Sequence, residues 1–209
     1  MPSVYDLKPA FQRLLRPLAE GLARAGVSPN AVTCVALAGS LAGGAVLTWR
    51  HGDARALLLL PPWLFVRMAL NAIDGMIARG YGKATPAGAV LNELGDVVSD
   101  LALYLPLALW ASPSRWPVVL FAIAAALTEF CGVLGPMLGA TRRYDGPMGK
   151  SDRAFVVGAL ALITYFAPAA GAQWRWVFGA LALLCAATCA RRIASELREV
   201  RTAREAAAR

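Results

Sequence analysis

The chain has 209 residues and a formal net charge of +8, yet only 16% of its residues are charged and 58% are hydrophobic. Soluble domains average about 25% charged residues, so this composition excludes a disordered chain and disfavours an ordinary soluble enzyme. Apolar runs of transmembrane length also argue against a nucleic-acid partner. A basic, apolar chain indicates an integral membrane protein whose cations contact membrane lipids.

The first predicted element is an amphipathic stretch at residues 6–24, with leucine and phenylalanine side chains on one side. We expect residues 1–27 to form a juxtamembrane helix that lies on the membrane surface. The sequence Ser28-Pro29-Asn30 then interrupts the chain before the first membrane span.

Six apolar segments approach the roughly 20 residues that a helix needs to cross the bilayer core. They lie at 31–49, 56–79, 86–111, 117–139, 154–170 and 174–190. The sequence therefore predicts an all-α integral membrane protein. Its single domain covers 1–209, with a six-helix bundle at 28–190 and a charged cytoplasmic tail at 191–209 that leaves the membrane as a helix. With both ends in the cytoplasm, sixteen of the 21 cations lie on the inner side and four in outer loops. This distribution follows the positive-inside rule and suits a bacterial-type inner or plasma membrane.

Two stripes of polar and small residues cross the second and third predicted spans at helical spacing. The first consists of Arg67, Asn71, Asp74 and Ala78, and the second of Gly88, Asn92, Asp96 and Asp100. Thr85-Pro86 is a favourable helix start, and the short loop before it predicts an antiparallel hairpin with facing stripes near the cytoplasmic side. Clustered oxygen ligands suit Mg²⁺ or Mn²⁺, which in turn bind substrate phosphates. We therefore expect metal-assisted phosphoryl transfer from a lipid-linked nucleotide.

Further cations have two interpretations each. Arg142, Arg143, Lys150 and Arg153 either reflect the positive-inside bias or bind an anionic acceptor beside the metals. Arg67 and Glu129 both fall near mid-bilayer, so Arg67 pairs with Glu129, lines the pocket, or does both.

The hairpin motif resembles the signature of the CDP-alcohol phosphatidyltransferases. It reads Asp74-Gly75-Met76-Ile77-Ala78-Arg79 and, after eight residues, Gly88-x3-Asn92-x3-Asp96. A Pro29-Asn30-x2-Thr33 start to the first span, six spans and an N-terminal surface helix are similar to the same family. The resemblance implies a homodimer in which each protomer holds two divalent ions between its second and third spans.

The resemblance also implies attack of a small alcohol on the β-phosphate of CDP-diacylglycerol, with release of CMP. The expected metal ligands are Asn71, Asp74, Asn92, Asp96 and Asp100. The expected base is Asp96 or Asp100. The expected substrate-binding residues are Gly75, Ala78, Arg79, Gly88, Arg142, Lys150 and Arg153, with Arg79 on the pyrophosphate.

Asn71 and Asn92 occupy positions where the family signature has acids, and we expect Asp100 to supply part of the missing charge. A register shifted by one helical turn, ending on Asp96 and Asp100, is the less favoured alternative. A catalytically weakened member that binds lipid or nucleotide and, less favoured, a small transporter are the competing functions. Glycerol 3-phosphate, inositol phosphate, serine and other small alcohols all fit as acceptors, with a preference for a phosphate-bearing one.

Overall fold

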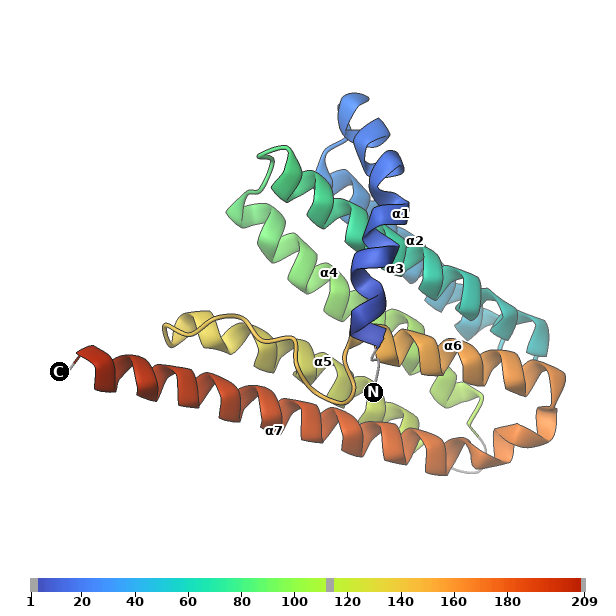
Figure 1. Cartoon of the computed structure of the whole chain (residues 1–209). Helices are drawn as coiled ribbons and strands as arrows, with labels where there is room; N and C mark the ends of the chain where they lie inside the picture. The colour runs from blue at the N-terminus through green and yellow to red at the C-terminus, as the bar shows by residue number, and fades with distance from the viewer. Residues whose placement is uncertain (1–3, 112–114, 208–209) are drawn as a thin grey trace.

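The computed structural model describes residues 4–111 and 115–207, and within these ranges it is helical and has no strand. The α-helices are α1 (Val4–Arg24), α2 (Pro29–Trp49), α3 (Leu60–Gly80), α4 (Pro86–Tyr104), α5 (Trp116–Met137), α6 (Lys150–Phe166) and α7 (Trp174–Ala207) (Figure 1). Three 3₁₀ helices join them: η1 (Ala54–Leu59), η2 (Leu105–Leu109) and η3 (Pro168–Gln173). The prediction of an all-α chain is confirmed. Residues 1–3 and 208–209 of the predicted terminal segments lie outside the described ranges.

Four helical segments in the described ranges are long and apolar enough to cross a membrane. They are Pro29–Trp49, Ala54–Gly80, Trp116–Met137 and Pro168–Ala207, which correspond to the first, second, fourth and sixth predicted spans. This supports an integral membrane protein. Helix α4 falls short because it carries Glu93, Asp96 and Asp100, and α6 because it has only 17 residues. The count of six spans therefore stays a prediction.

The last span and the charged tail form one helix. The sequence predicts that residues 191–209 form a helix leaving the membrane, and α7 runs without interruption for 34 residues, from Trp174 to Ala207. At about 1.5 Å per residue it is roughly 50 Å long, well beyond the ~30 Å hydrocarbon core. Figure 1 shows its C-terminal part extending past the end of α5, along which it packs. The charged residues after 190 thus continue a rigid helix that reaches out from the apolar part of the fold.

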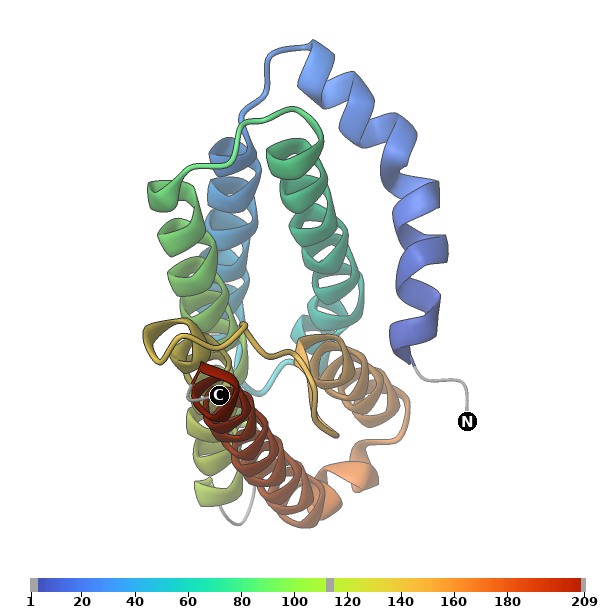
Figure 2. The same cartoon turned by 60° about the vertical axis from the view of Figure 1, so that its left-hand side comes forward.

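Small residues on α2 allow α3 and α4 to approach it closely. A Cβ at Gly39 would lie 2.1 Å from the Trp63 ring of α3, and one at Gly44 would lie 2.1 Å from the Ala102 carbonyl oxygen of α4. Figure 2 shows α2, α3 and α4 side by side, with α1 along the outside of α3. This arrangement brings the polar stripes of α3 and α4 together.

Helix α1 packs on α3 through alanines. Ala19 and Ala23 are buried in one apolar cluster with Ile73 and Ile77 of α3. Leu14 and Leu18, by contrast, are 74% and 54% exposed, so α1 presents apolar side chains outward as well. The helix expected near the N-terminus is therefore present, whereas its position on a membrane surface stays a prediction.

Candidate active site

The predicted polar stripes of α3 and α4 meet through reciprocal hydrogen bonds. Asn71 Nδ2 on α3 donates to Asp96 Oδ1 on α4 at 3.0 Å, and Asn92 Nδ2 on α4 donates to Asp74 Oδ2 on α3 at 3.1 Å. The register of α4 is set at its start, where Thr85 Oγ1 accepts a hydrogen bond from the Gly88 backbone N–H at 3.0 Å. Each asparagine therefore bonds the aspartate of the opposite helix.

Asp74 receives its side-chain hydrogen bonds from neutral groups. Its carboxylate accepts a hydrogen bond from Thr33 Oγ1 of α2 at 2.9 Å, besides the one from Asn92. Within residues 9–111 and 115–207, whose side chains the structure describes, no Lys, Arg or His nitrogen lies within 4 Å of this buried carboxylate. The contact between Thr33 and Asp74 links residues 41 apart, and no periodicity within one helix could have predicted it.

Asp96 is surrounded by cations instead. Lys150 Nζ, at the start of α6, forms an ion pair with Oδ2. Arg67 Nη2 lies 3.4 Å from Oδ1 and donates to the Asp96 backbone carbonyl at 3.0 Å. Two aspartates on facing stripes thus have opposite surroundings, one with neutral donors and the other with two positive charges.

Asp100 is enclosed between two guanidinium groups. Arg67 Nη1 lies 2.5 Å from one carboxylate oxygen, and Arg153 Nη2 donates to the other at 2.9 Å. Arg153 also pairs with Glu129 of α5 at 2.8 Å. The predicted pair between Arg67 and Glu129 is therefore wrong, because Arg67 takes the two aspartates of α4 while Glu129 takes Arg153. With both oxygens occupied by guanidinium groups, Asp100 is not placed to bind a metal in this structure.

This buried network ties four helices together, because Arg67, Asp100, Glu129 and Arg153 come from α3, α4, α5 and α6 respectively. The side chains of Asp100 and Arg153 are 1% and 0% exposed. Charges removed from water in this way need mutual pairing, and loss of one partner leaves an uncompensated buried charge. The network therefore fixes the start of α6, and with it Lys150, beside α4.

The predicted substrate-binding residues differ in accessibility. Arg79 is exposed at the end of α3, and its guanidinium lies against Gly75, where a Cβ would come within 2.9 Å of it. Ala78 is half-buried. Gly88 packs on the start of α2, since a Cβ there would lie 2.6 Å from Asn30 Oδ1. Gly75 thus makes room for Arg79, whereas Gly88 serves a contact between helices.

The basic segment between α5 and α6 approaches the same site. Arg142 pairs with Glu93 of α4, lies 3.8 Å from Glu129, and stacks over the Tyr144 ring at 4.4 Å. Its side chain and that of Lys150 are 25% and 24% exposed, so both reach solvent. The full burial of Arg153 instead argues against its predicted contact with an acceptor.

The C-terminal part of α7 holds this basic segment in place. Arg143 pairs with Glu199, and Arg192 Nε donates to the Asp145 carbonyl at 3.1 Å. Thr188 Oγ1 accepts a hydrogen bond from the Met148 N–H at 3.0 Å. Sequence reasoning predicted a charged helix leaving the membrane at 191–209 but assigned no contacts to it. The available signal was the recurrence of Thr188, Arg192, Glu196 and Glu199 at helical spacing.

The metal-binding capacity of the site rests on mixed ligands. Within the described ranges, no three side chains of the types Asp, Glu, His and Cys form a group that could hold a metal ion. Two carboxylates, Asp74 and Asp96, and the carbonyl oxygens of Asn71 and Asn92 remain as candidate donors. An all-oxygen set of this kind fits a hard divalent cation such as Mg²⁺ or Mn²⁺.

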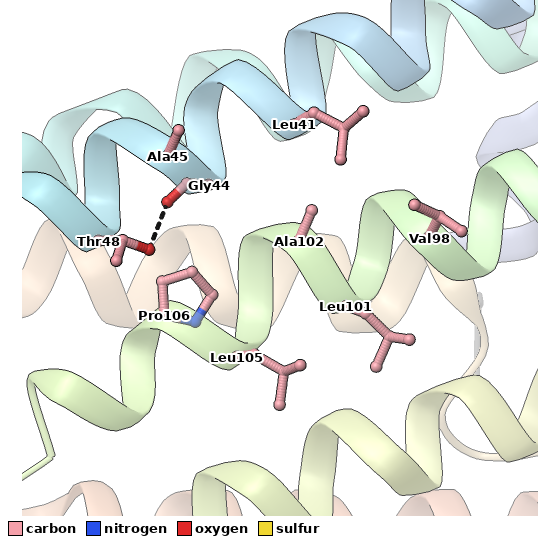
Figure 3. Close-up of a pocket in the computed structure, with 9 residues that line it drawn as sticks. All are labelled: Leu41, Gly44, Ala45, Thr48, Val98, Leu101, Ala102, Leu105 and Pro106. Atoms are coloured by element: carbon pink, nitrogen blue, oxygen red, sulfur yellow. Dashed lines mark hydrogen bonds between the residues drawn. The ribbon is translucent and has the colours of Figure 1, made fainter.

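An apolar groove lies apart from these charges, on the face between α2 and α4 (Figure 3). Its volume is about 410 Å³. It is lined by Leu41, Gly44, Ala45, Thr48, Val98, Leu101, Ala102, Leu105 and Pro106. The one polar side chain, Thr48, donates to the Gly44 carbonyl of its own helix at 2.9 Å. With no titratable group in its lining, the groove has no means of acid–base chemistry.

Comparison with known proteins identifies similar sequences. The family sequence model described as CDP-alcohol phosphatidyltransferase matches residues 26–188. The chain is 45% identical over 172 residues to Inner membrane protein YnbA of Escherichia coli (strain K12), covering 82% of this chain and 83% of the relative. It is 38% identical over 107 residues to a phosphatidylinositol phosphate synthase of Mycobacterium marinum, covering 49% of this chain and 42% of that protein.

The fold is similar to solved structures of the Mycobacterium tuberculosis phosphatidylinositol phosphate synthase. The structure with CDP-DAG bound superposes with a TM-score of 0.71 at 24% sequence identity, covering 90% of this chain and 94% of that one. The complex with manganese and citrate also gives 0.71, at 23% identity and 88% coverage of both chains. At this level of identity the likeness establishes the fold.

Proposed function

This chain belongs to the CDP-alcohol phosphatidyltransferase family, and we propose that it transfers a phosphatidyl group from CDP-diacylglycerol to a small alcohol, releasing CMP. One observation carries this proposal: the motif that starts at Asp74 on α3 and the stripe that ends at Asp96 on α4 face each other. Both lie within the residues that match the family.

Each group of the site has a proposed role in the reaction. The acceptor oxygen attacks the β-phosphorus of the CDP-lipid, the bond from that phosphorus to the bridging oxygen breaks, and CMP leaves with that oxygen. Arg79, exposed beside Gly75, binds the pyrophosphate as a bidentate donor. Asp96, at the position of the signature's final acid, takes the hydroxyl proton.

A divalent cation, Mg²⁺ or Mn²⁺, is the proposed cofactor, and the manganese complex of the similar mycobacterial enzyme supports it. Asp74 and the amide oxygens of Asn71 and Asn92 would hold one ion, and Asp96 would hold the second ion where the family's pair is complete. When bound, such an ion neutralises charge on the phosphoryl oxygens and polarises the phosphorus. The family signature implies two ions per chain.

The proposed acceptor carries a phosphate. The relatives named phosphatidylinositol phosphate synthases support a phosphorylated polyol. Arg142 and Lys150, each about a quarter exposed, are the cations available to it. Arg153, buried below them, keeps the start of α6 in position rather than touching the acceptor. An acceptor phosphate would compete with Glu93 for Arg142.

We further propose that the active site faces the cytoplasm and that the protein is a homodimer. The excess of cations near the predicted inner ends supports the orientation, and the family resemblance supports the dimer. Both proposals can be checked without any assay of activity.

A weakened, binding-only family member is the second candidate. It is favoured by the two asparagine amides that donate to Asp74 and Asp96, and by the ion pair between Lys150 and Asp96. Release of CMP separates the two candidates. Purified protein is incubated with CDP-diacylglycerol, Mn²⁺ and, in separate reactions, inositol phosphate, glycerol 3-phosphate or serine. CMP formed with a phosphorylated acceptor supports the transferase, and binding of the CDP-lipid without CMP from any acceptor supports the second candidate.

A further inference from the structure

The two aspartates of the site differ in what balances their charge. Asp96 has the Lys150 ammonium on one oxygen and the Arg67 guanidinium near the other. Asp74 receives a hydroxyl and an amide, both uncharged. A buried carboxylate that no cation pairs with directly is costly, so Asp74 is the position with the greater need for positive charge. At Asp96 that need is already met by the protein.

A count of charges gives the same result for the part of the site that surrounds Asp74 and Asp96, without the exposed Arg79. The polar cluster consists of Asp74, Glu93, Asp96, Asp100 and Glu129 with Arg67, Arg142, Lys150 and Arg153. Five negative and four positive charges leave −1. One divalent ion changes this to +1, whereas two would give +3 in a site that is partly shielded from water. Charges of one sign crowded into a medium of low dielectric constant repel strongly, so the second ion is disfavoured.

The asparagines contribute to this balance by their orientation. Asn71 and Asn92 direct their Nδ2 groups, which are donors, at the carboxylates of Asp96 and Asp74. A carboxylate at either position would bring a negative charge to the opposite aspartate and call for a further cation. The amides instead stabilise both aspartates as hydrogen-bond donors while adding no charge.

Lys150 is held where it can act as a fixed positive charge. It begins α6, whose first turn is closed by a hydrogen bond of 3.0 Å from the Gly149 N–H to Asp152. One turn later, Arg153 anchors α6 to Asp100 and Glu129. The ammonium therefore reaches Asp96 from a helix end that the buried network fixes.

We infer that each chain holds one divalent cation, at Asp74, and that the Lys150 ammonium takes the place of a second ion at Asp96. This rests on the proposed function, because only the family implies that second position. Asp74 and the asparagine oxygens supply hard ligands for one ion. Asparagine at positions 71 and 92 removes negative charge, and the lysine beside Asp96 supplies the positive charge that a second ion would bring. The two changes therefore compensate each other.

Binding of Mn²⁺ tests this without any turnover. The full chain in detergent is titrated with Mn²⁺, and free ion is followed by electron paramagnetic resonance. We expect one Mn²⁺ per wild-type chain and an affinity at least about tenfold lower in Asp74→Asn. Lys150→Gln should gain a second site, because Asp96 then loses its ammonium. The charge-matched double variant Asp96→Asn/Lys150→Gln should keep one ion within about threefold of the wild-type affinity.

Lys83→Gln is the matched control, since Lys83 lies in the loop between α3 and α4 and its Nζ bonds the Val27 carbonyl at 3.5 Å rather than an acid. It should bind Mn²⁺ as the wild type does. Two ions, or none, on the wild type would overturn the inference, as would loss of binding in the double variant. If Lys150→Gln fails to fold, the number of Mn²⁺ ions bound by the wild type and by the double variant still tests the inference. One ion without CMP release refutes the proposed function alone, and CMP release with two ions refutes this inference alone.

Discussion

Substitution of Asp100 by asparagine separates a structural role from a chemical one. The sequence suggests that Asp100 supplies charge to the metals or acts as the base, so that Asp100→Asn would abolish activity. In the structure, the two carboxylate oxygens of Asp100 instead pair with Arg67 and Arg153, and its side chain is 1% exposed. Removing one partner of a buried ion pair costs about 3–5 kcal/mol, because it leaves positive charge uncompensated away from water, even though Arg67 keeps Asp96 and Arg153 keeps Glu129. Here two guanidinium groups lose their shared carboxylate.

This loss should appear as lower stability. For a chain of 150–250 residues, 1 kcal/mol moves Tm by about 2–4 °C, so we expect Asp100→Asn to lower Tm by roughly 6–20 °C. Asp74→Asn is the matched control, because its hydrogen bonds come from Thr33 and Asn92 and an amide oxygen still accepts them. It should lose CMP release while Tm stays within about 2 °C.

Both variants are measured in one detergent preparation, by thermal unfolding followed with tryptophan fluorescence and by CMP release. An Asp100→Asn protein with unchanged Tm and no activity would refute the structural assignment. Asp100 would then act at the reacting centre, as the sequence suggests.

Three further predictions concern the residues around this network. Arg79→Lys should raise KM for CDP-diacylglycerol about tenfold or more, because a point charge replaces a bidentate donor; unchanged kinetics would leave Arg79 no role at the pyrophosphate. Arg142→Gln should raise KM for a phosphorylated acceptor while KM for the CDP-lipid stays within about twofold, and equal effects on both would argue against an acceptor site. Glu199→Gln, which weakens the tie from α7 to Arg143, should make the loop before α6 more sensitive to limited proteolysis, and an unchanged cleavage pattern would contradict the support assigned to α7.

The sequence was most informative where periodicity within one helix carried the signal. The stripes that include Asp74 on α3 and Asp96 on α4 were predicted from spacing alone, and the structure brings them together. The start of α4 at Pro86 followed from the Thr85 cap. Such features depend on neighbours three or four residues apart, so a single sequence contains them.

Periodicity within one helix could not predict contacts between helices that are far apart in the sequence. Depth in the membrane suggested Glu129 as the partner of Arg67, but depth does not specify how two helices are rotated about their axes. In the structure Arg153 on α6 takes Glu129 instead. Charge patterning likewise predicted a charged helix leaving the membrane after residue 190 but not the burial of Arg192 and Glu196, which are 2% and 1% exposed. Burial of such residues depends on a loop that folds back over α7, which composition does not reveal.

The central claim is transfer of a phosphatidyl group at the hairpin of α3 and α4. Its most direct test is the product balance with purified protein, CDP-diacylglycerol, Mn²⁺ and inositol phosphate, in which CMP and the new phosphatidyl lipid are both quantified by mass spectrometry. The wild type should form them in equal amounts, and Asp74→Asn should form neither while keeping its Tm. Equal product formation by Asp74→Asn, or CMP formed without any new lipid, would contradict the account.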